Sequence, residues 1–492
     1  MSMMQMLLGA AGATGEKYWY KNFNDPSTQE NYANNSKTVV TADAIYWAVV
    51  SYEESDNEDG QSVAVIKMDK DGAIQWCSKL DNSGTSGDDH ITLNGMDVDS
   101  NGNIYVAFRA GPTSSLVVYI YKLDPSDGTL ESFNNRSFYP TGTLSGYISI
   151  GSTGNSLWVD SNDNVYVTGK HNSSPSYIPT MKYNSSGTYQ WCTRIVPSDT
   201  SSWIYLMTFT QSFTDSDGNT YVVGYRYDNT TNYNQFAECY KYNSSGTFQW
   251  LAKWKSSDAG TWESCRARTV CTDSSGNVYV GGETTDEGQG QYNQLTCINS
   301  SGTIQWHKTF TSDVSTTSLD EINGITVDSD DKLYITFGAF AEGDESNVKG
   351  IVIKFDPSNQ SIVWVRRWTY SGTGVYGNMK VTIDTTGDDD VMLVNYRSNE
   401  SDPFGDALKG YWLWRLPVDG TLTGTHGDWS YVVPIDPNNN NAVITFGVST
   451  SDASTPSETN STDTSGTYNS TDYSSNATLD TSFDINTLVS VS

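Results

Sequence analysis

Residues 215–222 read DSDGNTYV, and this pattern returns as DSNGNIYV from Asp99, DSNDNVYV from Asp160, DSSGNVYV from Asp273 and DSDDKLYI from Asp328. Two worn copies begin at Asp43 and Asp384. The tyrosines of the pattern recur every 55–61 residues, at Tyr46, Tyr105, Tyr166, Tyr221, Tyr279 and Tyr334. Repetition at a near-fixed period of this length indicates a repeat architecture.

A second turn lies between successive copies and ends in Gln-Trp, as in KYNSSGTYQW up to Trp191 and KYNSSGTFQW up to Trp250. In such turns Gly or Asn supplies positive φ, while Asp or Ser bonds its own backbone. Short runs of Val, Ile, Tyr and Thr flank both turns, which is typical of β-hairpins. Two hairpins give four antiparallel strands, the content of one propeller blade. Seven units therefore predict an all-β fold, a seven-bladed β-propeller.

The chain ends predict how the ring closes. Residues 18–23 resemble the strand that follows each second turn, and they lie one repeat before Trp76. The seventh unit has a third strand at 410–414 but no clear Gln-Trp partner. We expect the N-terminal strand to complete blade seven, with residues 425–434 as the alternative last strand. The predicted domains are an apolar docking segment (1–16), the propeller (17–434) and a Ser/Thr/Asn-rich extended C-terminal arm (435–492).

Composition limits the partners. The 492 residues carry a net charge of −30 and four histidines, which argues against nucleic acid and anionic membrane as partners. The apolar start is too short to span a bilayer, so no membrane insertion is expected. No Lys or Arg precedes it, which favours a retained docking segment over a cleaved signal peptide. The six cysteines have no metal-type spacing, and we expect buried free thiols rather than a disulfide framework.

Motifs for chemistry are few. Asp215, Asp217 and Asn219 match the start of a calcium loop, but the distal bidentate Glu is missing and the same residues suit a tight hairpin. Turn chemistry is therefore favoured, and no metal or cofactor is expected. The sequence has no nucleophile elbow, zinc-protease motif or phosphate loop. The four histidines fall in different units, so we expect no catalytic residues and a protein that is not an enzyme.

A binding surface is expected on the face opposite the repeated turns, where the connections vary in length and composition. Function commonly lies on variable loops over a fixed scaffold. Aromatic residues in these segments, beside acidic loops, suit stacking on sugar rings or contact with a basic protein patch. The alternative, equally favoured, is that they plug the tops of the blades. The candidate binding residues are His90, Tyr147, Trp203, Tyr205, Trp262, Asp320 and Tyr376.

Over residues 17–424 the repeat resembles seven-bladed propeller repeats of bacterial surface proteins and of structural proteins in tailed-phage virions. The start MSMMQMLLGAAGA resembles the openings of tail and fibre proteins, marine cyanophage-like ones in particular. This resemblance implies a non-enzymatic component of the virion, assembled in the host cytoplasm. Its docking segment and C-terminal arm would contact other virion proteins, and its loop-bearing face a host glycan or receptor. The alternatives are a secreted or cell-surface bacterial propeller that binds carbohydrate or protein, and a glycan lyase or hydrolase.

Overall fold

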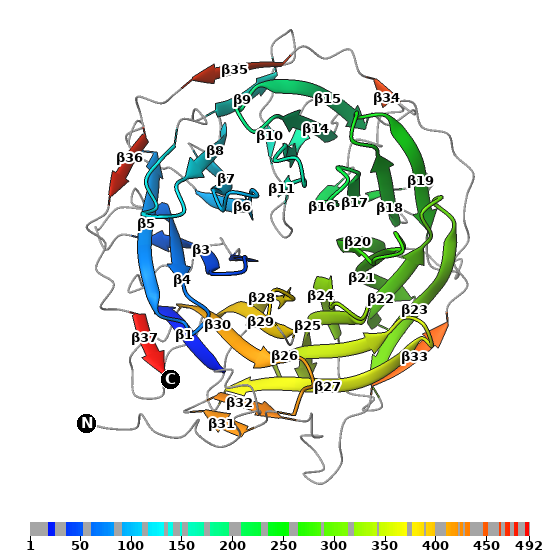
Figure 1. Cartoon of the computed structure of the whole chain (residues 1–492). Coiled ribbons are helices and arrows are strands. Elements are labelled where there is room, and N and C mark those ends of the chain that lie inside the picture. The colour runs from blue at the N-terminus through cyan, green and yellow to red at the C-terminus, as the bar shows by residue number, and fades with distance from the viewer. Residues whose placement is uncertain are drawn as a thin grey trace.

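Seven antiparallel sheets surround a central axis and form a closed ring (Figure 1). The computed structural model describes residues 18–24, 36–52, 61–82, 91–110, 117–131, 136–140, 148–149, 156–171, 178–195, 208–227, 235–254, 264–286, 290–312, 319–341, 344–370, 376–387, 390–398, 410–421, 424–426, 429–432, 446–450, 462–463, 468–472, 477–480 and 488–491. These residues contain β-strands and no helix, so none of them forms an apolar helix of membrane-spanning length. The predicted all-β, seven-bladed propeller is confirmed.

The first four blades follow the chain order. Blade one contains β2 (Lys37–Val40), β3 (Ile45–Tyr52), β4 (Gln61–Met68) and β5 (Ile74–Asn82). Blade two contains β6 (Thr92–Val98), β7 (Ile104–Ala110), β8 (Val117–Leu123) and β9 (Arg136–Pro140). Blade three contains β11 (Leu157–Val159), β12 (Val165–Thr168), β14 (Ile178–Tyr183) and β15 (Tyr189–Ile195), beside a small pair formed by β10 (Ile148–Ser149) and β13 (Lys170–His171). Blade four contains β16 (Thr208–Thr214), β17 (Thr220–Tyr227), β18 (Gln235–Tyr242) and β19 (Phe248–Trp254).

The last three blades include the closure of the ring. Blade five contains β20 (Cys265–Thr272), β21 (Val278–Asp286), β22 (Gly290–Ile298) and β23 (Ile304–Ser312). Blade six contains β24 (Leu319–Val327), β25 (Leu333–Ala341), β26 (Asp344–Asp356) and β27 (Ser361–Tyr370). Blade seven contains β28 (Tyr376–Asp384), β29 (Val391–Ser398), β30 (Gly410–Pro417) and β1 (Trp19–Asn24).

The N-terminal strand closes blade seven, as predicted. β1 pairs antiparallel with β30 in a register that sets Trp19 opposite Arg415 and Phe23 opposite Tyr411. The alternative closing segment lies elsewhere: β32 (Trp429–Val432) pairs with β27 of blade six and with β31 (Gly424–His426). Strands from both chain ends thus share one sheet, which leaves the ring without an open join.

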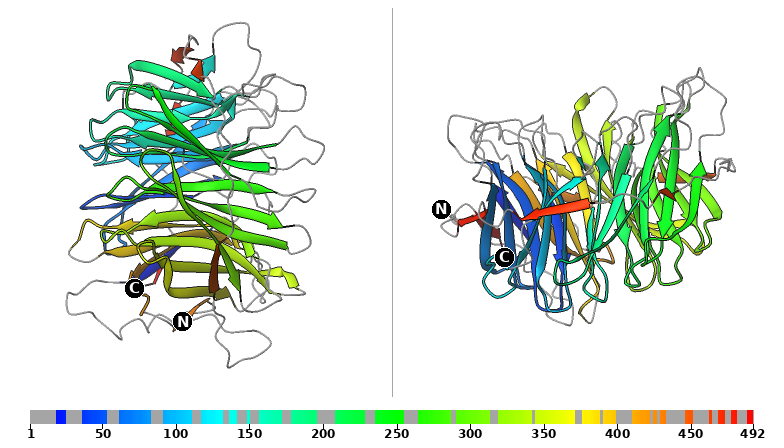
Figure 2. Two further views of the ribbon diagram at one scale, coloured as in Figure 1. Left: turned by 90° about the vertical axis from the view of Figure 1, so that its right-hand side faces the viewer. Right: turned by 90° about the horizontal axis from the view of Figure 1, so that it is seen from above.

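The C-terminal arm adds a fifth strand to most blades. β33 (Phe446–Thr450), β34 (Thr462–Asp463), β35 (Tyr468–Asp472), β36 (Ala477–Asp480) and β37 (Leu488–Val491) pair with blades five, three, two, one and seven. We call these and β32 the rim strands. All of them run antiparallel to the outermost strand of their blade. Figure 1 shows them outside the ring, and the two side views show a thick disc (Figure 2).

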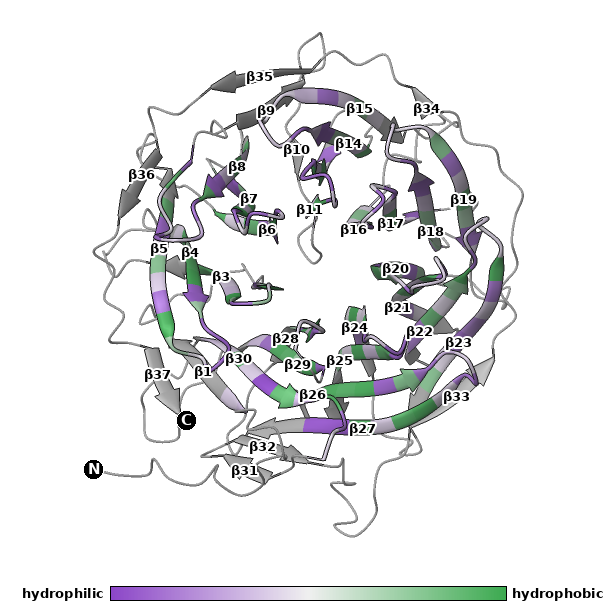
Figure 3. Ribbon diagram, in the orientation of Figure 1, coloured by the Kyte–Doolittle hydropathy of each residue, from purple (hydrophilic) through white to green (hydrophobic). Residues whose placement is uncertain are grey.

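The hydrophobic core lies between the blades. One cluster joins Tyr105 of blade two to Leu157 of blade three and Val222 of blade four. Figure 3 shows hydrophobic residues on the strands all the way around the ring. Because no blade covers both of its own faces, each depends on its neighbours for burial of apolar surface. All six cysteines are free and buried, as predicted.

Two tryptophans of the Gln-Trp pairs, Trp191 and Trp250, contact the second turn of the next blade. The indole N–H of Trp191 donates to the Ser244 carbonyl at 3.2 Å, and that of Trp250 donates to the Ser300 carbonyl at 3.0 Å. Gly246, beneath Trp191, has a φ of 77°, and a Cβ there would lie 2.8 Å from the indole. The turn therefore needs glycine for its conformation and for space. Trp191 and Trp250 thus pack between neighbouring blades.

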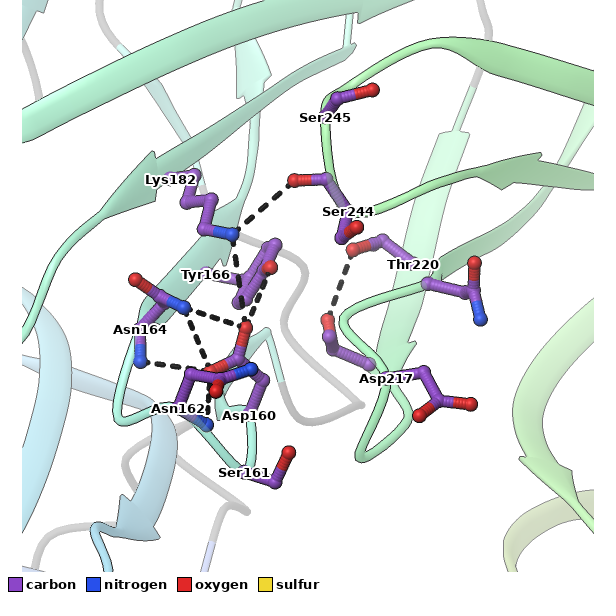
Figure 4. A network of polar contacts seen from close by, with 12 residues as sticks. Asp160, Ser161, Asn162, Asn164, Tyr166, Lys182, Asp217, Thr220, Ser244 and Ser245 are labelled. Atoms are coloured by element: carbon purple, nitrogen blue, oxygen red, sulfur yellow. Dashed lines mark hydrogen bonds and ion pairs between the residues drawn. The ribbon is translucent and has the colours of Figure 1, made fainter.

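The first turn is held by its aspartate. Asp160 Oδ1 accepts the backbone N–H of Asn164 at 2.9 Å, and Oδ2 accepts the Tyr166 hydroxyl at 2.8 Å (Figure 4). Lys182 Nζ lies 3.7 Å from Oδ2 and donates to the Ser244 carbonyl of the next blade at 3.2 Å. The motif DSxxNxY is thus a hydrogen-bonded unit that fixes the turn and reaches the neighbouring blade.

Candidate binding site in the central channel

The innermost strands of the seven blades line one cavity on the axis of the ring. Its volume is about 300 Å³, within the range of small-molecule sites. Residues from β2, β6, β11, β16, β20, β24 and β28 contribute to its wall. The wall is mostly neutral, with Thr, Asn, Gln and apolar side chains, so its charged groups stand out.

β-Bulges shape this wall. Register shifts fall immediately before Gly95, Gln211, Thr269, Gly324 and Lys380, each in the innermost strand of its blade. These five residues lie four positions before the Asp of their first turn. A bulge bends its strand and re-aims the side chains that follow it. The equivalent residue of blade one is Lys37, four positions before Thr41.

The wall at this level brings two lysines together. Lys37 from β2 and Lys380 from β28 occupy equivalent positions in the first and last blades, and their side-chain nitrogens lie within hydrogen-bonding reach of each other. Lys37 is 4% exposed, and its Nζ meets no hydrogen-bond acceptor in the described part of the chain. Each ammonium group is positively charged and can only donate hydrogen bonds. The two groups therefore repel each other when both are charged.

The pKa values of the two lysines reflect this repulsion and their burial. Burial and the adjacent charge of Lys380 hold the pKa of Lys37 well below its ordinary value. Burial lowers the pKa of Lys380 to about 8. The nearby Asn395 amide does not neutralise them, because it accepts from Ser36 Oγ at 2.9 Å and donates to Thr38 Oγ1 at 2.8 Å. An anion in the cavity would restore both positive charges.

An unpaired acceptor belongs to a residue that lines the same cavity as the lysines. Asn323 of β24 is 7% exposed, lines the cavity, and its Oδ1 has no hydrogen-bond donor among the described residues. The next residue, Gly324, packs against blade seven: a Cβ there would lie 3.1 Å from the Lys380 Cα. The backbones of blades six and seven therefore approach closely at the residue that follows Asn323.

Asp97 is the acidic group of the channel wall. It lies in β6 and accepts the backbone N–H groups of Val159 at 2.7 Å and of Val98 at 2.9 Å. The side chain touches the channel, yet it lies deep within the ring. Burial raises the pKa of Asp97 to about 7 despite the two hydrogen bonds. This carboxyl joins blade two to blade three and takes up a proton near neutral pH.

An aromatic pair completes the wall. Trp158 of β11 and Phe213 of β16 both line the cavity and pack edge to face, with ring centroids 4.9 Å apart. The Trp158 indole N–H donates to the Ser212 carbonyl at 2.7 Å, which fixes the ring. An indole held in this way offers a rigid apolar surface to a ligand.

Most of the candidate binding residues chosen from the sequence lie outside the described residues: His90, Tyr147, Trp203, Tyr205 and Trp262. Asp320 lies in β24 and Tyr376 at the start of β28, both innermost strands. Their role in binding stays a prediction. The sequence reasoning missed Lys37, Lys380, Asn323 and Asp97. The repeat alignment holds one signal for the lysines, since each stands where other blades have Gly, Ser, Gln or Thr.

The aspartates of the first turns hold the turn conformation through hydrogen bonds to its backbone. Asp215 Oδ1 accepts the backbone N–H groups of Asp217 at 3.1 Å and of Asn219 at 2.8 Å. Within the described ranges no three His, Cys, Asp or Glu side chains are grouped to hold a metal ion. The hydrogen bonds explain why the repeat uses Asp at this place.

Comparison with known proteins identifies similar folds alone. No protein-family model and no curated protein matches the chain. Among solved structures, a polysaccharide lyase is similar at 11% identity, over 84% of this chain and 94% of that one, with a TM-score of 0.46. A Dyadobacter fermentans protein of unknown function has 11% identity over 67% and 95%, with a TM-score of 0.41. The Synechocystis apocarotenoid oxygenase has 10% identity over 81% and 93%, with a TM-score of 0.39.

These comparisons correct one expectation from the sequence. We expected a protein that is not an enzyme, yet the similar structures include a polysaccharide lyase and an oxygenase. Enzymes are thus found among the proteins that resemble this ring, and the fold gives no ground for excluding catalysis. The absence of familiar catalytic motifs was too weak a reason, because propeller sites are assembled from different blades.

Proposed function

We propose that the protein is a structural component of a tailed-phage virion, in the tail or fibre, with the propeller as a rigid platform. The observation that supports this is the set of rim strands. They pair with the outermost strands of blades one, two, three, five, six and seven. Outermost strands with free backbone groups tend to pair with other chains, and a fifth strand removes that tendency. Such a disc suits a place in an ordered assembly, since it resists edge-to-edge polymerisation.

The position of the chain ends supports the proposed contacts. β37 pairs with β1, with Tyr20 opposite Val491 and Phe23 opposite Leu488. The N-terminal end of β1 and the C-terminal end of β37 therefore lie side by side at the outer edge of blade seven. We propose that contacts with other virion proteins are made from this edge, while the face opposite the turns is left for a host glycan or receptor.

The test is quantitative mass spectrometry of density-purified particles and of the soluble secretome from the source culture. The proposal expects enrichment in particles at a fixed ratio to capsid protein, with residues 2–16 retained. A second arm removes residues 1–16, which leaves β1 in place, and expects loss of incorporation with an unchanged unfolding profile. Absence from particles, with a trimmed N-terminus in the secretome, would reject the virion role.

A second candidate is a secreted or cell-surface propeller that binds carbohydrate or protein. The cavity favours it, because a buried donor and a buried acceptor without partners are costly unless a ligand satisfies them. A mature N-terminus near Ala13 in culture medium would support this candidate over the first.

A further inference from the structure

We propose that the central channel binds a small hydroxylated carboxylate, of the sugar-acid class, through Lys37, Lys380 and Asn323. Lys37 and Lys380 would hold the carboxylate, and Asn323 would accept a hydrogen bond from a hydroxyl group. The proposal rests on the described wall of the cavity and does not depend on a virion role.

Two lysines bring positive charge to the wall of the cavity. Lys37 lines the cavity, and its Nζ is buried and lacks an acceptor within the described residues. Lys380 lies beside it from the neighbouring blade. A carboxylate has two oxygens and accepts from two donors at once, so one such group would give Lys37 the acceptor that it lacks and offset the repulsion between the two lysines. A neutral ligand would leave the repulsion in place.

The cavity wall also contains a residue with an unpaired acceptor, Asn323. Asn323 Oδ1 is buried without a donor among the described residues, and Asn323 lines the same cavity as Lys37 and Lys380. Sulfate, a halide or a simple carboxylate has no hydrogen to offer this oxygen, and hydrogen phosphate carries its O–H on the same group that the lysines would hold. A hydroxyl close to the carboxylate does, as in a sugar acid. The pairing of an unsatisfied donor with an unsatisfied acceptor therefore indicates a ligand with both groups.

Size and shape agree with one sugar ring. The cavity of about 300 Å³ is at the small end of ligand sites. Trp158, fixed by its indole hydrogen bond, forms part of the same wall and gives a surface for the apolar face of a sugar. Gln211 lies at the lysine level across the channel and adds a polar side chain for further hydroxyls.

The lysine pair lies in a protein whose overall net charge is −30, and this contrast supports a role for the pair in binding an anion. The protein as a whole repels anions, so long-range electrostatic attraction will not speed the binding of an anionic ligand. Its affinity will depend on contacts inside the channel. Added salt should therefore weaken binding little, because a buried site is screened less than a surface patch.

The experiment is isothermal titration calorimetry of the full chain with sodium D-glucuronate, against D-glucose and sodium phosphate at matched ionic strength. We expect glucuronate to bind with a Kd of about 1 mM or tighter, and glucose and phosphate at least about tenfold more weakly. The Lys37→Met/Lys380→Met variant should lose at least about tenfold in glucuronate affinity. Lys308→Met, a substitution on the outer strand β23, serves as the matched control and should bind as the native chain does.

Three results would overturn the proposal. These are no heat from glucuronate up to about ten times the expected Kd, equal binding of glucose, or unchanged affinity in the double Met variant. If phosphate binds in place of glucuronate, the site is for an inorganic anion and the sugar-acid assignment fails. Should the double variant not fold, Asn323→Ala replaces it: glucuronate affinity should fall several-fold, and an unchanged value would reject the role of the amide.

Discussion

The hydroxyl of Tyr166 donates a 2.8 Å hydrogen bond to Asp160 Oδ2, six residues earlier in the same blade. The pair recurs in blades two, four, five and six, with distances of 2.9–3.3 Å. Burial and the carboxylate raise the pKa of Tyr166, which keeps the hydroxyl protonated as a donor. The tyrosine spacing visible in the sequence is thus the spacing of a hydrogen bond that ties each first turn to its second strand.

Tyr166→Phe should lower the free energy of unfolding by about 1 kcal/mol, at the low end for a bond to a charged group. The loss is modest because Asn164 and Lys182 still contact the Asp160 carboxylate. Tyr46→Phe is the matched control, since Thr41 replaces the aspartate in blade one. Urea unfolding of both variants measures the difference, and equal losses would show that the carboxylate contributes nothing specific.

Asp163 connects two blades from a left-handed conformation. Its φ is 61°, where blades two, four and five have glycine, and its carboxylate accepts from Ser100 N at 2.8 Å and Ser100 Oγ at 2.9 Å. Asp163→Gly removes strain but also both hydrogen bonds, so we expect a net loss of about 1 kcal/mol.

A double-mutant cycle with Ser100→Ala tests this contact between blades. The two substitutions should couple by about 0.5 kcal/mol or more, because Ser100 loses its side-chain donor and Asp163 its acceptors. Additive losses would mean that Asp163 acts on its own turn alone. Asp331 and Ser274 repeat the arrangement at 2.9 and 2.6 Å and offer an independent copy for the same cycle.

Gly282 allows β20 and β21 to approach at a bulge. A Cβ at Gly282 would lie 1.9 Å from the Arg266 carbonyl oxygen, so Gly282→Ala forces the strands apart. We expect a loss of about 3 kcal/mol in unfolding free energy. Gly276→Ala in the preceding turn is the control: its Cβ would have 3.7 Å of clearance and the cost is a φ of 77°, about 1 kcal/mol. Similar midpoints for the two variants in urea would contradict the steric argument.

The sequence predicts the parts of the fold that rest on local chemistry. The turn motif, the tyrosine spacing and the strand at 18–23 lead to seven blades and to the closure by β1, since each depends on residues close in the repeat. The rim strands leave no such pattern. Their pairing uses backbone groups, so the polar composition of residues 446–491 says little about which blade each strand meets.

The cavity is harder still to predict. Lys37 and Lys380 come from the first and last blades, and their contact depends on closure of the ring together with the bulge before Lys380. Asp97 looks like an ordinary acidic residue before a turn, and its proximity to Val159 follows from the packing of two blades. The repeat alignment marks the two lysines as departures from the other blades, but it does not show that they meet.

His307 and Asp97 should make stability depend on pH in opposite directions. Burial lowers the pKa of His307 to about 4, with Nδ1 2.8 Å from the Thr296 hydroxyl, so the unfolded chain binds the proton first. Its stabilising contribution is complete above about pH 6.5 and is lost as the pH falls toward 4. Asp97, with its pKa raised to about 7, binds its proton first in the folded chain, so its contribution grows as the pH falls from 7 to 4.

Thermal or urea unfolding between pH 4 and 8 separates these effects. His307→Gln should remove an acid-induced loss of at most about 1.4 kcal/mol per pH unit, so the variant gains on the native chain as the pH falls. Asp97→Asn should do the reverse: relative to the native chain, it is most favourable at pH 8 and least favourable near pH 4. A pH profile unchanged by His307→Gln would show that the buried imidazole is protonated as readily in the folded chain as in the unfolded one. An unchanged profile for Asp97→Asn would mean that this carboxyl stays ionised in the channel.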